Sequence, residues 1–345
     1  MIRHTPALTA EQADIANLIG VVVARTTEHV GDEYPDEVAQ IRRRLAELGV
    51  WTIGVAEDAA DSVADEFAAV AFSALGRNWP ALGWATVQAH AAVESLGRHP
   101  LAESVRSGAA AVAVVDERST AVRLTVTDGR VHGRIDRIDP AGTFPHIVVL
   151  GRGHVRVIPP EALTFHPLAR TGLDGACTAS AEISAPVPES TATIIGVDTE
   201  AARIRLMLGA AAVALGTAQA AAEAALSYAA QREQFGSPLI RLANVRDALF
   251  SSSAAVATGL REVLRARDCS VWQATAVVDA VCEQAIDTCA LAVQAHGGYG
   301  YLTEYQVERM LRDVVSLRAA CDVSAARRVA AGELVGVDTK SEESS

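Results

Sequence analysis

The chain has 345 residues, half of them hydrophobic but only 4% aromatic, and a formal net charge of −12 at pH 7. A chain of this length can bury a large core and is expected to divide into about two or three subdomains. The acidic balance argues against nucleic acid as a main partner, because such a partner needs a broad basic face. With so few aromatic residues, we expect a core built mainly from Ala, Val and Leu.

The first part, residues 1–107, is predicted to be an N-terminal helical domain. The segment DEVAQIRRRLAELGV places Val38, Ile41, Leu45 and Leu48 on one helix face. Two later segments, DEFAAVAFSALGR and ATVQAHAAVESLGR, repeat this pattern and each closes on a glycine at the expected C-cap. The first twenty residues carry acidic side chains inside their apolar stretch, so we expect no signal peptide and a cytoplasmic protein.

Residues 108–195 differ in composition and predict a small antiparallel β domain. Short β-branched segments, among them AAAVAVVDE and HIVVLGRGHVRVIP, alternate with glycine-rich turn sequences. The segment TVTDGRVHG is typical of a β-hairpin, because Asp-Gly suits a two-residue turn. The middle third of the chain is therefore predicted to hold the strands.

Residues 196–336 return to a helical pattern and predict a C-terminal four-helix bundle, followed by a polar tail, 337–345, that we expect to be disordered. The apolar run LMLGAAAVALGTAQAAAEAAL is interrupted by Gln219 and Glu223, which favours a buried bundle helix over a membrane span. The predicted fold class is mainly α with a central β domain. Since no GxGxxG follows a predicted strand, the pattern excludes a doubly wound nucleotide fold.

Cysteine and histidine usage indicates neither disulfides nor a metal site. The cysteines form no CxxC pair and lie mostly in helical sequence, which predicts reduced core thiols. The nine histidines show no metal-ligand spacing. The cysteines are Cys177, Cys269, Cys282, Cys289 and Cys321.

The segment YAAQREQFGSPLIRLANVRDALF, Tyr228 to Phe250, is the first candidate binding element. It predicts a helix that carries Arg232 in its last turn, ends at Gly236 and restarts after Pro238. Arg-x-Gln-Phe-Gly places a guanidinium, an amide and a ring at one helix end, which suits a diphosphate beside an aromatic group. Taken alone, a helix C-cap with an arginine that compensates the helix dipole explains the segment equally well.

The segment QAHGGYGYLTEYQVERMLRD is the second candidate element. Gly297 and Gly298 permit a backbone approach that a side chain would block, and Gln294 offers an amide that both donates and accepts. We interpret His296 as a packing residue or a weak cofactor contact. A plain helix–loop–helix turn is the alternative interpretation of the paired glycines.

Together the two segments resemble the acyl-CoA dehydrogenase family, whose pattern is YxxxRxQFGxPxxxxxxVxxxL followed by QxxGGxGYxxEYxVERxxRD. Both patterns are nearly complete here and occur in the same order. The segment LARTGLDGACTASAEISAPVPES is similar to the family's strand that enters the bundle. The order helical, β, helical is the layout of that family, so the resemblance extends over the whole chain.

The resemblance implies chemistry at FAD. In the family a carboxylate removes the α-proton of an acyl-CoA thioester while the β-hydride passes to the flavin. FAD lies across a dimer interface, where the two segments of one subunit hold the diphosphate and adenosine half of the neighbour's FAD. The cofactor-binding residues implied here are Arg232, Gln234 and Phe235 near the diphosphate, and Gln294, Gly297 and Gly298 at the adenosine end. One departure is Ala243, where the family has glutamine.

The other departures concern catalysis. The family's base in its commoner location falls on Cys321, and a second location used by some members falls on Leu206. Neither is a carboxylate, and an unperturbed thiol is mostly protonated at neutral pH. Asp322 is a weak candidate, because on a helix one residue out of phase turns a side chain by about 100°. The resemblance therefore implies no catalytic residue in this chain.

The middle domain also departs from the family's pattern. The segment VVDERST stands where the family has its flavin- and thioester-lining Thr-Glu-Pro and Gly-Ser-Asp elements. We interpret its charged residues and those nearby as solvated hairpin faces: Asp116, Glu117, Arg134 and Arg137. The half-site that this chain would use itself is therefore expected to be lost.

The resemblance thus implies the non-basic subunit of a heteromeric, α2β2 acyl-CoA dehydrogenase, as in bacterial steroid degradation. Its expected partners are a second acyl-CoA dehydrogenase subunit, an acyl-CoA substrate and an electron-transfer flavoprotein as acceptor. A homomeric enzyme that uses Asp322 or a relocated carboxylate such as Glu200 is one alternative. A flavin monooxygenase or oxidase of the same superfamily and a flavin-free scaffold subunit are the others.

Overall fold

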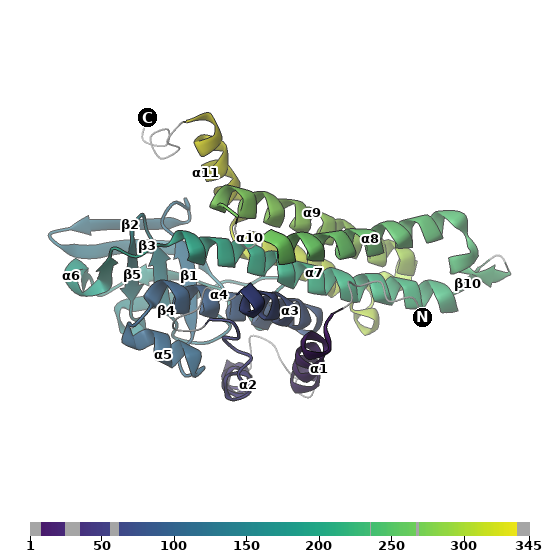
Figure 1. Ribbon diagram of the computed structural model, residues 1–345, viewed down its shortest axis with the longest axis horizontal. Helices are drawn as coiled ribbons and strands as arrows, with labels where there is room; N and C mark the ends of the chain where they lie inside the picture. Colours follow the sequence, from purple (N-terminus) through teal and green to yellow (C-terminus); the bar gives the residue numbers. More distant parts are fainter. Residues whose placement is uncertain (1–7, 25–34, 56–61, 235, 267–268, 337–345) are drawn as a thin grey trace.

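The protein was analysed as a computed structural model that describes residues 8–24, 35–55, 62–234, 236–266 and 269–336. Phe235 and the predicted polar tail, 337–345, lie outside the described residues. Helices come first in the chain, strands follow in the middle, and a long helical bundle closes it (Figure 1). The predicted fold class is confirmed.

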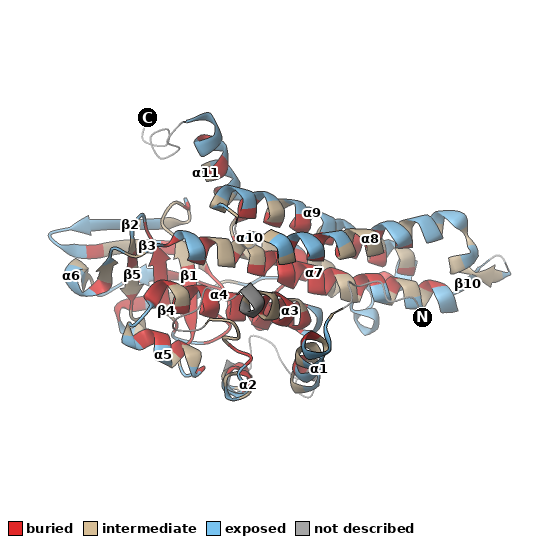
Figure 2. Cartoon of the chain, in the orientation of Figure 1, coloured by how far each residue is buried: buried red, intermediate tan, exposed pale blue. Residues whose placement is uncertain are grey.

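The elements of the N-terminal domain are α1 (Ala10–Ala24), α2 (Pro35–Glu47), α3 (Ser62–Asn78), α4 (Pro80–Leu96) and α5 (Pro100–Arg106). Within this domain, α4 packs against α3 and α5, and α1 packs against α3. Helix α2 buries Val38, Ile41 and Leu45, as their spacing predicted. Helix α4 lies in the middle of the molecule (Figure 2), and every one of its residues except Glu94 is buried. A helix that is apolar on all sides is expected to be buried in this way.

The middle of the chain forms two sheets. The elements are β1 (Val112–Asp116), β2 (Val122–Thr127), β3 (Arg130–Ile138), β4 (His146–Leu150), β5 (His154–Ile158), the 3₁₀ turn η1 (Pro160–Ala162), β6 (Leu163–Pro167), β7 (Ala179–Ile183), β8 (Val187–Pro188), the short helix α6 (Glu189–Ala192) and β9 (Thr193–Ile195). One sheet has the order β1-β4-β5-β9, and the other has the order β2-β3-β7-β6, with β8 also paired to β3. The predicted hairpin is β2 and β3, joined by Asp128 and Gly129, both with positive φ.

The expectation of a purely antiparallel β domain was wrong for one pair of strands. Strands β1 and β4 run parallel, with Val112 opposite His146 and Val115 opposite Val149. Between them the chain leaves this sheet to form the β2–β3 hairpin in the other sheet, and it returns in its original direction. Two parallel strands need such a crossover connection between them, and no local sequence pattern predicts it.

The β1–β4 layer is buried on both faces. Val112, Val114, Val148 and Leu150 belong to the core shared with the helices. Ala113, Ile147 and Val149 belong to a second core between the two sheets. Because side chains alternate across a strand, consecutive apolar residues serve both cores, and the sheet joins the helices to the outer hairpin.

The C-terminal helices form the predicted bundle. The elements are α7 (Glu200–Gln231), β10 (Glu233–Gln234), β11 (Ser237–Pro238), the 3₁₀ turn η2 (Leu239–Arg241), α8 (Ala243–Arg265), α9 (Val271–His296), the 3₁₀ turns η4 (Gly297–Tyr301) and η5 (Thr303–Tyr305), α10 (Val307–Ala320) and α11 (Val323–Val335). In Figure 1 the bundle extends horizontally away from the β domain, with the β10–β11 hairpin at its far tip and α11 projecting upward.

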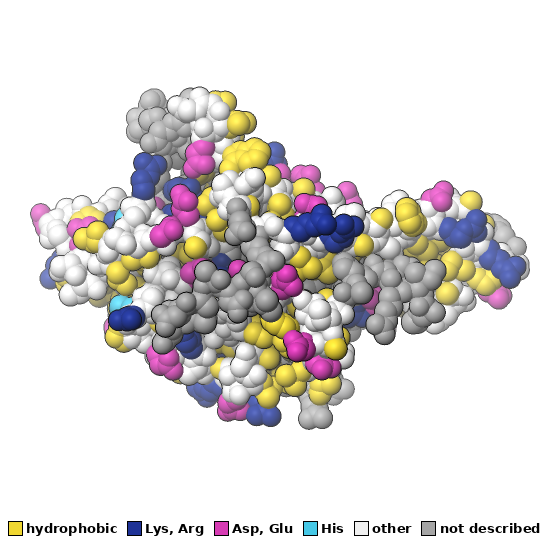
Figure 3. Space-filling view, viewed as in Figure 1, with side chains coloured by type: hydrophobic (Ala, Val, Ile, Leu, Met, Phe, Trp, Pro, Cys, Tyr) yellow, Lys and Arg dark blue, Asp and Glu magenta, His cyan; other side chains and the backbone are white. Residues whose placement is uncertain are grey.

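Helix α7 approaches the N-terminal helices closely. A Cβ at Gly216 would lie 1.9 Å from the carbonyl oxygen of Ser73, and one at Gly76 would lie 2.1 Å from that of Val213. Only glycine permits such contacts between two helix backbones. Helix α7 is long and apolar enough to cross a membrane, but 67% of its most apolar window is buried inside the protein. On the face in Figure 3, acidic and basic side chains are interspersed over the bundle.

Candidate functional site

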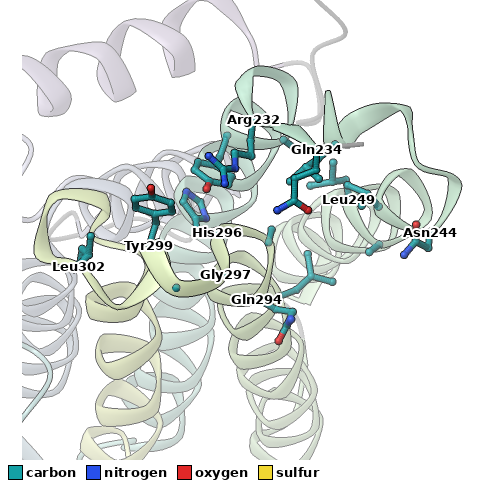
Figure 4. A pocket seen from close by; sticks show the side chains of 17 residues that line it. Arg232, Gln234, Asn244, Leu249, Gln294, His296, Gly297, Tyr299 and Leu302 are labelled. Carbon is teal, nitrogen blue, oxygen red and sulfur yellow. The ribbon is translucent and has the colours of Figure 1, made fainter. Parts of the chain in front are cut away.

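A pocket lies at the tip of the bundle, where α7 ends, α8 begins and α9 ends. Its volume is about 640 Å³, within the range of about 300–1,000 Å³ that is usual for small-molecule sites. We call it the bundle-tip pocket (Figure 4). It is lined by Tyr228, Ala229, Arg232, Gln234, Leu239, Asn244, Val245, Ala248, Leu249, Leu291, Gln294, Ala295, His296, Gly297, Gly298, Tyr299 and Leu302.

The end of α7 differs from the sequence-based prediction. The helix was expected to reach Gly236, but it ends at Gln231, and Arg232 is its extended C-cap with φ −75° and ψ 120°. The chain then turns back, because Gln234 pairs with Ser237 and the backbone N–H of Leu239 donates to the carbonyl of Arg232 at 2.8 Å. This small hairpin releases Arg232 from the helix and directs it toward the pocket.

Five of the six predicted cofactor residues line this single pocket, although they come from two segments far apart in the sequence. Phe235, the sixth, lies outside the described residues. The side chains of Arg232, Gln234 and Gln294 are exposed and make no hydrogen bond or ion pair with any residue that the structure describes. Their donors and acceptors are therefore available to a ligand, and their role in cofactor binding stays a prediction.

An aromatic cluster next to Arg232 was not predicted from the sequence. The rings of Tyr228 and His296 stack with centroids 4.2 Å apart, and Tyr305 packs edge-on against both. Tyr299 packs against Tyr305 and is 44% exposed, and the Arg232 guanidinium lies 5.6 Å from its ring centroid. The spacing of Tyr228 and Arg232, four residues apart on one helix, is the signal that could have suggested a shared face.

His296 is a packing residue, as interpreted from the sequence. It is 4% exposed, and its Nδ1 donates to the carbonyl of Ala292 at 2.7 Å. This bond and the stack on Tyr228 hold the last turn of α9 in place. The following glycines are thereby presented at a fixed position in the pocket.

The glycines leave an open surface. Gly297 has φ +58°, a conformation that residues with a side chain rarely adopt. A Cβ at Gly298 would meet no atom within 4 Å, so nothing in the described chain requires glycine there for space. Among the described residues that line this pocket, none is acidic. A free guanidinium, open backbone and no opposing carboxylate fit the diphosphate of FAD.

A second pocket lies between the β domain and the bundle, and we call it the junction pocket. Its volume is about 190 Å³, below the usual range for a small-molecule site. Leu206, Cys321 and Asp322 all line it, so the structure brings both expected base positions together.

Ion pairs occupy one wall of the junction pocket. Asp116 accepts hydrogen bonds from Arg118 and from Arg203, whose Nε lies 2.7 Å from Asp116 Oδ2. Burial alone would raise the pKa of Asp116, but the bonds and charges of Arg118 and Arg203 outweigh it and leave the pKa lowered. Arg203 is 6% exposed and also donates to the Leu150 and Gly151 carbonyls.

The interpretation of these charges as solvated hairpin faces was wrong except at Arg134, which is exposed and pairs with Asp136. Glu117 pairs with Arg156, and Arg137 pairs with the buried Asp139 at 2.7 Å. The sequence pattern identified the local charges but not their distant partners. These are Arg156 for Glu117 and Arg203 for Asp116.

Both candidates at the expected base position have hydrogen-bond partners within the chain. Cys321 is 5% exposed, and the neighbouring Cys282 thiol together with burial raises the pKa of Cys321. Asp322 does not continue a helix, contrary to the sequence-based prediction. It has φ 49° and ψ 48° and forms the N-cap of α11, where it accepts from the Ala325 N–H at 3.3 Å and from the Ser119 hydroxyl.

The remaining candidates from the sequence are the cysteines, a metal site and Glu200. The five cysteines all lie within the described residues, and none of them is part of a disulfide. Among the described residues, no cluster of three or more His, Cys, Asp or Glu side chains could hold a metal ion. Glu200 is exposed at the start of α7 and does not line the junction pocket.

Part of the chain matches a known protein family. Residues 200–320 match the family model described as acyl-CoA dehydrogenase, C-terminal domain. Over 110 residues the chain is 40% identical to "Probable acyl-CoA dehydrogenase YngJ" of Bacillus subtilis (strain 168). That match covers 30% of this chain and 29% of YngJ, so the chain matches less than a third of the length of that relative.

Solved structures match over nearly the whole chain. The butyryl-CoA dehydrogenase of Megasphaera elsdenii has a TM-score of 0.79 at 18% identity and covers 96% of this chain and 99% of its own. A structure described as PigA with FAD and proline has a TM-score of 0.78 at 16% identity and covers 95% of this chain and 98% of its own. At such identities the likeness establishes the fold, and the fold is that of acyl-CoA dehydrogenases.

Proposed function

We propose that this chain, which has the acyl-CoA dehydrogenase fold and that family's C-terminal domain over residues 200–320, is a subunit that completes the FAD site of another subunit. The reaction would be the α,β-dehydrogenation of an acyl-CoA thioester. The chain would contribute the bundle-tip pocket and no catalytic base. The active assembly would be heteromeric, with the base carried by a second acyl-CoA dehydrogenase subunit.

The observation that carries the proposal is the state of Arg232. An exposed guanidinium that has an aromatic face beside it and no anionic partner among the described residues is suited to an anion from outside the chain. The open backbone at Gly298 admits a ligand of some width beside it. A diphosphate presented by a neighbouring subunit has both the charge and the shape required.

The junction pocket supports the second half of the proposal. An acyl-CoA dehydrogenase that acts alone needs a free carboxylate at the position of Cys321 or Leu206. The carboxylates among the described residues that line this pocket are Asp116, which is paired with arginines, and Asp322, which caps α11. A base works best with a pKa near the working pH, whereas the pKa of Asp116 is lowered.

In the assembly, FAD would accept the hydride from the β-carbon of the substrate. The residues of this chain would then bind and orient: Arg232 the diphosphate, and Gln294 with the backbone at Gly297 and Gly298 the adenosine end. We further propose an electron-transfer flavoprotein as acceptor and a cytoplasmic location. A bulky, steroid-derived acyl group is proposed from the family resemblance alone.

The test compares two arginine variants of the complex formed with the partner subunit. Arg232→Ala should lower FAD affinity roughly tenfold or more, because a hydrogen bond to a charged group contributes about 1.5–3 kcal/mol. Arg261→Ala removes an exposed arginine of α8 that does not line the pocket, and it should leave FAD affinity unchanged. The measurement is bound flavin per complex after dialysis.

The outcomes separate the alternatives. Equal flavin retention in the Arg232→Ala and Arg261→Ala complexes would remove the diphosphate role. Turnover by this chain alone would establish a homomeric enzyme. Absence of flavin from every preparation of the complex would establish a flavin-free scaffold.

A further inference from the structure

The bundle-tip pocket has two chemically distinct ends. In Figure 4, Tyr299 and Leu302 lie at one end, Arg232 and His296 in the middle, and Leu249 and Asn244 toward the other end, with Gln294 below them in the view. The first end and the middle carry the cation and the aromatic rings. The far end combines apolar side chains with side-chain amides.

The apolar floor of the far end comes from two helices. Val245, Ala248 and Leu249 belong to α8, and Leu291 belongs to α9. Gln234, Asn244 and Gln294 are the amides that border this floor (Figure 4). An apolar floor bordered by groups that both donate and accept suits a heterocyclic base, which buries its face and pairs at its edge.

Asn244 is placed to read such a base. It lies in the first turn of α8, it is exposed, and its amide makes no hydrogen bond to any residue that the structure describes. Ala243, its neighbour in the chain, does not line the pocket. The first turn of α8 fixes the backbone of Asn244 at the border of the pocket.

The chemistry of an asparagine amide distinguishes one purine from another. Its oxygen accepts from the exocyclic N6 amine of adenine while its nitrogen donates to N7, and a good bidentate pair of this kind discriminates by about 1–3 kcal/mol in nucleic-acid recognition. Hypoxanthine carries a carbonyl oxygen in place of that amine. The amide oxygen would then face another acceptor, and one hydrogen bond would be lost.

We propose that Asn244 is the specificity-determining residue of the bundle-tip pocket and that it selects an adenine base through its N6 and N7 edge. The inference rests on the proposed function, because the base is the adenine of the cofactor whose diphosphate Arg232 contacts. It assigns two independent tasks to the two ends of the pocket. Arg232 provides affinity for any diphosphate, and Asn244 provides the choice of base.

The experiment uses the purified full chain, with ADP and inosine diphosphate as probes at up to millimolar concentration. Calorimetric titration should give wild-type binding of ADP that is roughly tenfold tighter than that of inosine diphosphate. Asn244→Ala should weaken ADP binding until the two affinities are equal. Arg232→Ala should weaken both nucleotides by the same factor and keep their ratio.

A matched control is Gln231→Ala, which removes an exposed amide from the last turn of α7 outside the pocket and should change neither affinity. Unchanged thermal stability of Asn244→Ala would exclude a folding defect. A wild-type chain without preference, an Asn244→Ala variant that keeps the preference, or binding of neither nucleotide would overturn the inference. Flavin retention by the Arg232→Ala complex decides on the proposed function independently of these outcomes.

Discussion

At position 322 an aspartate carries out two structural tasks, and both engage its carboxylate. It accepts from the Ala325 N–H as the N-cap of α11 and from the Ser119 hydroxyl of the β domain. Its left-handed backbone, with φ 49°, turns the chain between α10 and α11. Asparagine tolerates this conformation and caps helices about as well, whereas alanine does neither.

Two variants of Asp322 separate capping from catalysis. Asp322→Asn should leave turnover of the assembled complex within a few-fold of wild type, because under the proposed function no proton transfer depends on this carboxylate. Asp322→Ala should lower the free energy of unfolding by about 1 kcal/mol, the usual effect of a lost N-cap, and should also retain turnover. A loss of turnover of about 10²–10⁴-fold in Asp322→Asn, measured by acyl-CoA oxidation, would instead identify a general base.

At the residue scale the sequence was informative where a pattern was contiguous. Arg232, Gln294 and the paired glycines were located because each belongs to a short motif, and the structure brings them to one pocket. Tyr228 and Asn244 lie within the first candidate segment, but neither was predicted as a site residue, because the local pattern does not show which side chains line the pocket. Their relevance arises only when α7, α8 and α9 meet at the tip of the bundle.

At the scale of elements, boundaries were less predictable than the elements themselves. The helical pattern of α7 continues past Gln231, but the β10–β11 hairpin ends the helix five residues before Gly236. The pairing of Glu233 with Pro238 gives those backbone groups partners that compete with the helix. A two-residue strand leaves no periodicity in the sequence, so this competition could not be read from it.

One buried carboxylate on helix α10 binds the backbone of a neighbouring loop. Asp313 is 3% exposed and accepts from the backbone N–H of Leu173 at 2.6 Å, and Arg309 lies 3.8 Å away. At Gly172, a Cβ would lie 2.2 Å from the carbonyl oxygen of Arg312, which shows how closely the loop approaches α10. Burial raises the pKa of Asp313 from 3.8 to about 6.

This pKa predicts a pH dependence of stability. The folded chain holds the Asp313 proton up to about pH 6, whereas the unfolded chain releases it near the ordinary value of 3.8. The contribution of the protonated Asp313 to the free energy of unfolding is therefore fully present below pH 3.8 and is lost as the pH rises through about 6. A difference of about two pKa units corresponds to about 3 kcal/mol.

Asp313→Asn removes the titration and keeps an acceptor for the Leu173 N–H. The difference in unfolding free energy between wild type and variant should change by up to about 3 kcal/mol across this pH window. Denaturant unfolding of both proteins through the window measures it. Parallel stability curves for the two proteins would contradict the assignment.

For the whole molecule, the order of helical, β and helical segments was predicted because each third of the chain has its own hydrophobic period. The parallel pairing of β1 with β4 was not, since it depends on where the intervening hairpin packs. The sequence predicts one retained and one lost half-site, and that contrast stays a prediction. The two pockets differ in volume, about 640 Å³ at the bundle tip and about 190 Å³ at the junction.

The ratio of flavins to chains in the assembled complex tests the central claim most directly. The complex of this chain with its base-carrying partner should be purified to homogeneity, and its flavin absorbance compared with its protein content. If this chain completes a partner's FAD site and binds no flavin in its own junction pocket, as proposed, the complex should hold one flavin for each pair of unlike chains, and this chain alone should hold none. One flavin for every chain, or flavin retained by this chain in the absence of a partner, would contradict the account.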